Sequence, residues 1–252
     1  MIQNADDADL VDTMNLFVGS FSGLETLFVA TRDSQRIDVD KICRHGQTLR
    51  FLHLDLLYRT ERLLLSEASN LYTTTELEAL VAGCPRIEEL GIHAAAIDIS
   101  SSLHLGVPFF ISKRETLTKA LDVLARLHSL RSLRFTHSLA LAENTEIENL
   151  HLHGARYSQL ASEVIQYLVE RGSPIEIYST SPTVTPGFFE MEKDFQGHTW
   201  PHYFYVRGTL TVPLRGRHHT QVQAVGVTKE NIADYVRYPE ILFRSEQNDF
   251  KA

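Results

Sequence analysis

A short apolar phrase recurs along the chain, with a large aliphatic or aromatic residue at its first, fourth and sixth positions. Its five copies are Leu24-x-x-Leu27-x-Val29, Leu49-x-x-Leu52-x-Leu54, Ile87-x-x-Leu90-x-Ile92, Leu130-x-x-Leu133-x-Phe135 and Ile147-x-x-Leu150-x-Leu152. Because successive side chains of a strand point to opposite faces, each copy predicts a β-strand with its repeated residues in the core and the intervening ones presented outward. These strands are expected near residues 24–30, 49–55, 87–93, 130–136 and 147–153. A weaker sixth copy begins at Ile175, where Thr180 breaks the pattern.

Between the phrases the apolar period lengthens to about 3.6 residues, which is typical of helices. The stripes are Leu10-Met14-Phe17-Phe21, Leu77-Leu80-Val81, Leu117-Leu121-Leu124-Ala125 and Leu160-Val164-Leu168-Val169, with a shorter helix through Ile37, Ile42 and Cys43. Since helix and strand alternate and neither buries its apolar side alone, we expect an α/β protein: an irregular solenoid with a curved parallel sheet and outer helices. Two insertions, residues 58–73 and 94–113, are expected as loops on one rim of this scaffold.

The composition changes after residue 180, where leucine becomes rare and aromatic residues accumulate. Residues 203–214 and 221–227 alternate around a polar turn at 215–220, which predicts a β-hairpin. Thr228 is a candidate N-cap for a short helix through residues 231–237 that Pro239 stops. We therefore divide the chain into a repeat region, residues 1–180, and an aromatic-rich C-terminal segment, residues 181–252, whose hairpin and short helix cap the open core of the last repeat.

Charge and cysteine usage narrow the range of functions. The chain has 252 residues and a net charge of −8, which argues against nucleic-acid binding, because Arg215-x-Arg217-His218-His219 is too short to form a phosphate-binding patch. Cys43 and Cys84 show no pairing signal, so structural thiols in a reducing compartment are expected. An acidic N-terminus and the lack of a long apolar run indicate a soluble cytoplasmic or nuclear protein that does not associate with a membrane.

Three segments carry a further similarity: Phe21-Ser22-Gly23-Leu24-Glu25-Thr26-Leu27-Phe28-Val29, Arg44-His45-Gly46-Gln47-Thr48-Leu49-Arg50 and Gly83-Cys84-Pro85-Arg86-Ile87-Glu88-Glu89-Leu90. They resemble the leucine-rich-repeat portion of the F-box and leucine-rich-repeat-like proteins of filamentous fungi, over roughly residues 10–180. In that family an F-box precedes the repeats and docks on a cullin-ligase adaptor. No Leu-Pro-rich F-box segment precedes the repeats here, so the resemblance implies a substrate receptor of an SCF-type ubiquitin ligase only in a longer form that carries one.

Candidate chemistry is limited to histidines. His53, His93, His151 and His153 fall at presented positions of the phrases, which leaves a metal-dependent hydrolase open as an alternative function. Tetrahedral zinc needs three or four ligands within about 2.0–2.3 Å of the metal, whereas strands two repeats apart lie about 10 Å from each other. The sequence has no nucleophile elbow, phosphate loop or His-Glu-x-x-His motif. We therefore expect no catalytic residue, no metal and no cofactor.

The function that the pattern favours is recognition of a protein partner through the presented strand face and the rim loops. The expected contact residues are Phe28, Phe51, His53, Asp55, Glu89, His93, Arg134, Asn149, His151 and His153. Aromatic and arginine side chains inside a polar rim are typical of contact patches, and protonation of the histidines near pH ~6.5 would make binding pH-dependent. Binding by the rim loops or by the aromatic C-terminal segment instead of the strand face is left open.

Overall fold

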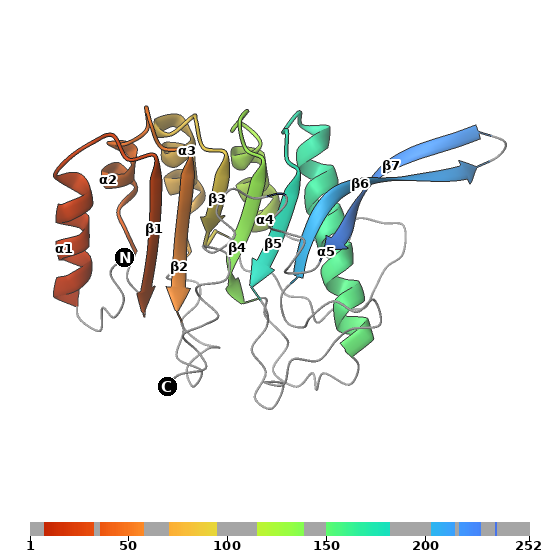
Figure 1. Cartoon of the computed structure of the whole chain (residues 1–252), viewed down its shortest axis with the longest axis horizontal. Coiled ribbons are helices and arrows are strands. Elements are labelled where there is room, and N and C mark those ends of the chain that lie inside the picture. Colours follow the sequence, from red (N-terminus) through yellow and green to blue (C-terminus); the bar gives the residue numbers. More distant parts are fainter. Residues whose placement is uncertain are drawn as a thin grey trace.

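The computed structural model is a mixed α/β fold. It contains one open sheet of seven strands in the order β1-β2-β3-β4-β5-β6-β7, with helices against it (Figure 1). It describes residues 8–32, 36–57, 71–94, 115–138, 150–181, 203–214, 217–227 and 235. The helices are α1 (Ala8–Gly19), α2 (Val39–Cys43), α3 (Thr74–Gly83), α4 (Glu115–Leu124) and α5 (Leu150–Glu170). The strands are β1 (Thr26–Arg32), β2 (Phe51–Leu57), β3 (Glu89–Ile92), β4 (Ser132–Ser138), β5 (Ile177–Ser181), β6 (Tyr203–Leu214) and β7 (Arg217–Val227).

Strands β1 to β5 are parallel and follow one another in chain order, as the first four phrases predict. Their register aligns the repeated leucines, because Leu27 pairs with Leu52, Leu52 with Leu90, and Leu90 with Leu133. Leu52, Leu90 and Leu133 have no exposed surface. The register inferred from the sequence is therefore confirmed for these strands.

The strand expected near residues 147–153 is wrong, because residues 150–153 begin helix α5. The broken sixth copy supplies the fifth strand instead, at Ile177–Ser181. A long stripe explains the difference: the fully buried positions of α5 follow a helical period, namely Tyr157, Leu160, Ala161, Val164, Ile165 and Leu168. Once such a stripe is packed, adding one more helical residue is easier than starting a new strand.

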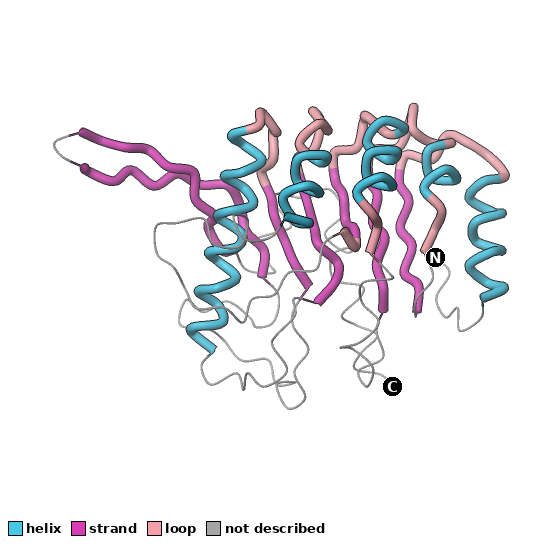
Figure 2. The backbone as a smooth tube through the Cα atoms, turned by 180° about the vertical axis from the view of Figure 1, so that it is seen from behind, coloured by secondary structure: helices cyan, strands magenta, loops and turns pink. Residues whose placement is uncertain are grey.

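The helices cover one face of the sheet and share a single apolar core with it (Figure 2). In helix α3 the buried residues are Leu77, Leu80 and Val81, and in α4 they include Leu117 and Leu121. These side chains join the core-facing strand residues in one cluster. The apolar stripe of each of these helices and one face of the strands are thus buried against each other, which is the arrangement that the alternating periods require.

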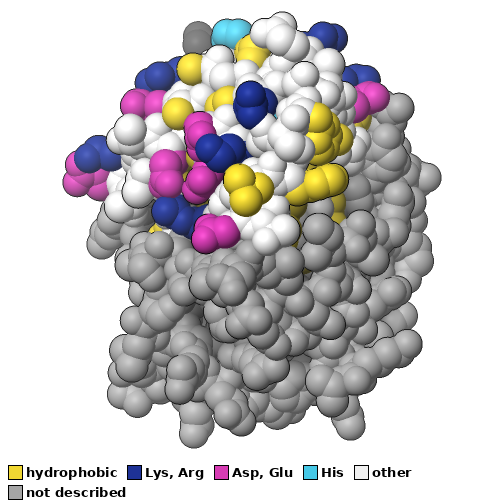
Figure 3. Space-filling model, turned by 90° about the vertical axis from the view of Figure 1, so that its left-hand side faces the viewer, with side chains coloured by type: hydrophobic (Ala, Val, Ile, Leu, Met, Phe, Trp, Pro, Cys, Tyr) yellow, Lys and Arg dark blue, Asp and Glu magenta, His cyan; other side chains and the backbone are white. Residues whose placement is uncertain are grey.

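Helix α1 stands at the β1 end of the sheet and turns a different stripe inward from the one expected. Val11, Met14 and Val18 are buried, whereas Leu16 and Phe17 are 72% and 58% exposed. The view onto this end shows hydrophobic side chains gathered beside charged ones (Figure 3). With no helix on its outer side among the described elements, α1 buries only the stripe that faces the sheet and α2.

A charged residue directly precedes each of the parallel strands β1 to β5, Arg207 within β6 continues this row, and the sign of the charge alternates from strand to strand. We call this row the charge ladder; it consists of Glu25, Arg50, Glu88, Arg131, Glu176 and Arg207. Arg50 binds Glu88 through two hydrogen bonds of 2.7 and 2.8 Å and Glu25 through one of 3.0 Å. Arg131 binds Glu176 at 2.6 Å. From Arg50 onward, the backbone amide of each ladder residue donates a hydrogen bond to the backbone carbonyl of the ladder residue before it. The ladder therefore lies along the end of the sheet at which β1 to β5 begin.

Strands β6 and β7 form the expected hairpin, although residues 217–220, expected in the turn, belong to β7; the hairpin extends the sheet, since β6 pairs antiparallel with β5. At its base Tyr205 and Ala224 are buried in the main core, and the Ala224 amide donates to Ser162 Oγ of α5 at 3.1 Å. Its far end projects from the body (Figure 1) and leaves Leu210 46% exposed. The short helix expected through residues 231–237 lies outside the described residues, apart from Tyr235. Within the described part of the chain, every helix is too short or too polar to cross a membrane.

Candidate functional site

The face of the sheet opposite the helices carries a row of polar, aromatic and glycine residues in strict register. Phe28 pairs with His53, His53 with Gly91, Gly91 with Arg134, Arg134 with Ser179, and Ser179 with Phe204, so one residue from each of six strands lies side by side. These positions alternate with the core leucines, which places them on the second face. The sequence pattern thus assigned the correct face to the predicted contact residues of β1 to β4.

The side chains on this face are not presented to solvent as expected. Most of the predicted contact residues are at least nine-tenths buried: Phe51 (2% exposed), His53 (4%), Asp55 (7%), Glu89 (8%), His93 (1%) and Arg134 (4%). Phe28 is half-buried. The exposed Phe28–Phe51 pair that the sequence predicts is therefore wrong. Alternation identifies the face of a strand but carries no information on whether that face meets solvent.

His53 lies against Gly91 on the neighbouring strand. A Cβ atom on Gly91 would come within 2.4 Å of His53 Nδ1, so only glycine leaves room for the imidazole at this position. Burial, and then the positive charge of Arg134, lowers the pKa of His53 to about 3. The ring is neutral at physiological pH, so the pH response expected of His53 is wrong: it does not gain a charge near pH ~6.5.

Beyond the end of β3, the Thr136 side chain connects the strands on either side of it. The hydroxyl of Thr136, on β4, donates to the carbonyl of Leu54, on β2, at 3.0 Å and lies 3.5 Å from His93 Nδ1. Strand β3 has four residues whereas β2 and β4 have seven each. Because β3 ends early, the Leu54 carbonyl loses its neighbour in the sheet, and the Thr136 hydroxyl takes the position of the missing amide.

The two edges of the parallel sheet differ in the connections that they carry. At the edge where β1 to β5 begin, the preceding connections have five to seven residues. At the edge where the strands end, which we call the carboxyl edge, the connections after β2, β3, β4 and β5 span residues 58–73, 93–114, 139–149 and 182–202. Two of these connections meet, because the Tyr72 amide donates to the His93 carbonyl at 2.7 Å. The prediction that both insertions emerge on one rim is confirmed at these two points; residues 58–70 and 95–114 lie outside the described part.

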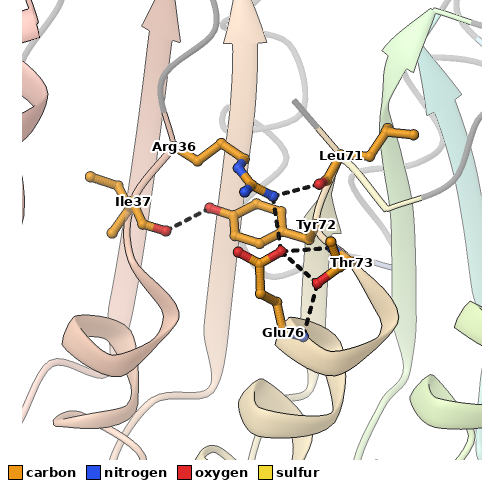
Figure 4. Close-up of polar contacts among 6 residues, drawn as sticks. All are labelled: Arg36, Ile37, Leu71, Tyr72, Thr73 and Glu76. Carbon is orange, nitrogen blue, oxygen red and sulfur yellow. Dashed lines mark hydrogen bonds and ion pairs between the residues drawn. The ribbon is translucent and has the colours of Figure 1, made fainter. Parts of the chain in front are cut away.

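A polar cluster fixes the connection that enters α3 (Figure 4). The Tyr72 hydroxyl donates to the Ile37 carbonyl at 2.9 Å, and Arg36 binds Glu76 at 3.0 Å and the Leu71 carbonyl. Thr73 and Glu76 cap the helix reciprocally. Partial burial raises the pKa of Glu76, but the hydrogen bonds from Thr73 and the charge of Arg36 outweigh it and hold that pKa below its usual value. These contacts fix the residues that lead into α3 at the carboxyl edge.

The remaining predicted contact residues do not join the row. His151 and His153 lie in α5, and the helical backbone removes the strand alternation by which they were assigned to the presented face. Asn149 lies outside the described residues. In the described part of the chain, no group of three or more His, Cys, Asp or Glu side chains could hold a metal ion. The geometry shown thus offers no position at which the predicted histidines converge on a metal.

Sequence reasoning missed the residues that give the face its shape. Gly91 stands inside a strand, where a glycine signals close approach of a neighbouring group, and it could have been recognised on that ground. Thr136 and Tyr72 have no such signal, because their roles depend on the early end of β3 and on a connection from elsewhere in the chain. The charge ladder was visible in principle, since all its members except Arg207 occupy the second position of the first four phrases or of the weaker copy at Ile175.

Comparisons with known proteins add no assignment: no family model, no curated protein and no solved structure matches this chain.

Proposed function

We propose that the protein is a leucine-rich-repeat-like interaction module that binds a protein partner at the carboxyl edge of its sheet. The repeated units, the parallel strands in chain order and the single layer of helices support this kind of scaffold. One observation carries the proposal: the long connections of the parallel sheet leave from the carboxyl edge, whereas the opposite edge has short turns and the charge ladder. Binding residues concentrate on loops held by a rigid scaffold.

The buried face of the sheet opposite the helices, which includes Asp55 and Glu89 beside the row, acts in this proposal as the foundation of the site and not as its contact surface. A neutral imidazole, a guanidinium and two carboxylates are enclosed there within three strands. Side chains enclosed to this degree leave little surface for a partner to contact. The contacts come instead from the connections, whose sequences include Phe109, Phe110, Phe188, Phe189 and Trp200. Aromatic side chains are the commonest anchors of protein interfaces.

The resemblance to F-box and leucine-rich-repeat-like proteins makes a ligase substrate receptor the specific form of this proposal. A cullin-ligase adaptor is then a partner only of a longer form that carries an F-box, and the partner bound at the carboxyl edge is the substrate. A cytoplasmic or nuclear location accompanies this role. The metal-dependent hydrolase receives no support from the described residues and is not proposed.

Capture with matched variants tests the proposal. The chain is tagged and used to recover partners from an extract of its own cells, alongside a Phe109→Ser/Phe110→Ser variant, a Phe188→Ser/Phe189→Ser variant and a Leu210→Ser/Val225→Ser control at two exposed positions of the hairpin. Circular dichroism confirms that each variant is folded. We expect one or both carboxyl-edge variants to lose the partner and the hairpin control to keep it. Retention by both edge variants with loss by the control would place binding on the hairpin and refute the proposal.

A further inference from the structure

Two cysteines that are 41 positions apart in the sequence lie together between adjacent helices. Cys43 is the last residue of α2, and Cys84 is the C-cap of α3. The Cys43 sulfur lies 3.6 Å from the Ala79 carbonyl of α3, and the Cys84 sulfur lies 3.9 Å from the Ile42 carbonyl of α2. Each thiol therefore points toward the helix that carries the other. Both cysteines are free thiols, and their proximity is a feature that the sequence did not signal.

Two glycines bring the helix ends close enough for the thiols to meet. A Cβ atom on Gly83 would lie 2.3 Å from the Cys43 sulfur and 2.9 Å from the Cys43 Cβ, and one on Gly46 would lie 1.7 Å from the Gly83 carbonyl oxygen. No other residue type fits at either position without moving the backbone. This approach places the two thiols close enough to shift the pKa values of each other in opposite directions.

The environments of the two sulfurs differ in a way that separates their chemical roles. Cys43 is half-buried, and the hydrogen bond from Cys84 lowers the pKa of its thiol; Cys84 is fully buried, and the same hydrogen bond together with burial raises the pKa of its thiol. The thiolate is the nucleophile in thiol chemistry, and accessible cysteines of lowered pKa next to a second cysteine are typical of redox pairs.

We propose that Cys43 and Cys84 are a redox-active pair that a low-molecular-weight disulfide, such as oxidised glutathione, converts to an intramolecular disulfide. The Cys43 thiolate attacks one sulfur of the small disulfide, whose S–S bond breaks, and one small thiolate leaves and takes up a proton. Cys84 then loses its proton and attacks the Cys43 sulfur, which releases the second small thiol. Two protein thiols are oxidised, and one small disulfide is reduced to two thiols.

The link would join the two helices that flank β2 and the connection 58–73. Oxidation would therefore close a covalent loop around one of the connections at the carboxyl edge. This consequence is independent of the identity of any partner, because the reaction needs only the folded chain.

The full chain with both thiols reduced is incubated with oxidised glutathione under native conditions, quenched by alkylation and measured by mass spectrometry. We expect both free thiols to disappear, a mass loss of about 2 Da, and a Cys43–Cys84 cross-linked peptide after digestion. The Cys84→Ala variant, checked for folding by circular dichroism, should stop at one glutathione on Cys43, and Cys43→Ala should not react while folded. A wild-type chain that keeps both thiols, or that ends with a stable glutathione adduct, overturns the proposal.

Discussion

The imidazole of His53 occupies the space above the α-carbon of Gly91, so a side chain on one strand fills the place of the missing side chain on the next. We expect Gly91→Ala to lower the free energy of unfolding by about 1–3 kcal/mol, as overpacking of a filled site does. Urea denaturation measures this loss. Without the clash, alanine would be the better strand residue, because it loses less chain entropy than glycine.

A double-mutant cycle separates the clash from any other effect of the alanine. In a His53→Ala background the same Gly91→Ala change should be neutral or stabilising, because the ring is gone. If the two changes simply add, the steric explanation does not hold.

The lowered pKa of His53 makes stability depend on pH. The unfolded chain protonates this histidine near pH 6.5, whereas the folded chain does so only at about 3. Between these values the unfolded state binds more protons, so stability falls as the pH falls, by about 1.4 kcal/mol per pH unit. His53→Gln should remove about 2 kcal/mol of the difference in unfolding free energy between about pH 7.5 and about pH 5.0. Equal pH dependence in the two proteins would show that His53 is accessible to protons in the folded state.

The aligned leucines give a direct test of the core. Replacing Leu52, Leu90 or Leu133 by alanine should cost about 2–5 kcal/mol of unfolding free energy, because each is fully buried and leaves a cavity. Leu16→Ala on the exposed side of α1 is the matched control and should change stability by no more than about 0.5 kcal/mol. Similar values for the core and the control variants in chemical denaturation would contradict the register.

The charge ladder predicts a salt-dependent contribution. Arg50 is shared by Glu25 and Glu88, so Arg50→Gln should lower the urea midpoint at low ionic strength, and the difference should shrink as salt screens the pairs. Arg126→Gln removes the same charge from an exposed residue that lies outside the ladder. The two variants should converge at high salt; an unchanged gap would mean that Arg50 acts by packing and not by charge.

The limits of prediction follow from the range over which each signal acts. The strands β1 to β4 were predictable because alternation and the leucine phrase are local. The phase of α1 was not, since Phe17 and Val18 are similarly apolar and only the neighbouring elements select which one faces inward. The fifth strand was misplaced because the phrase at Ile147 runs into the stripe of α5.

The sequence predicted which face of the strands carries the candidate site residues, but it did not predict how far those side chains are exposed to solvent. His53 and Arg134 were assigned to the correct face, yet their burial depends on the whole chain. Replacing Phe51, His53 and Arg134 together by alanine would therefore disturb folding, so such a variant is not a clean test of binding at this face. The contact between Cys43 and Cys84 was hidden for a similar reason, because it depends on the approach of two helices at Gly46 and Gly83.

The alternation of sign along the charge ladder has a consequence for how such a chain could lengthen or shorten. Loss of the unit that contributes Arg50 would bring Glu25 next to Glu88, and duplication of that unit would place two arginines side by side; both arrangements put like charges on neighbouring strands. Loss or gain of two consecutive units keeps every neighbour opposite in charge. The charge ladder thus favours the gain or loss of units in pairs, because a pair is the smallest change in the number of strands that leaves no like charges side by side.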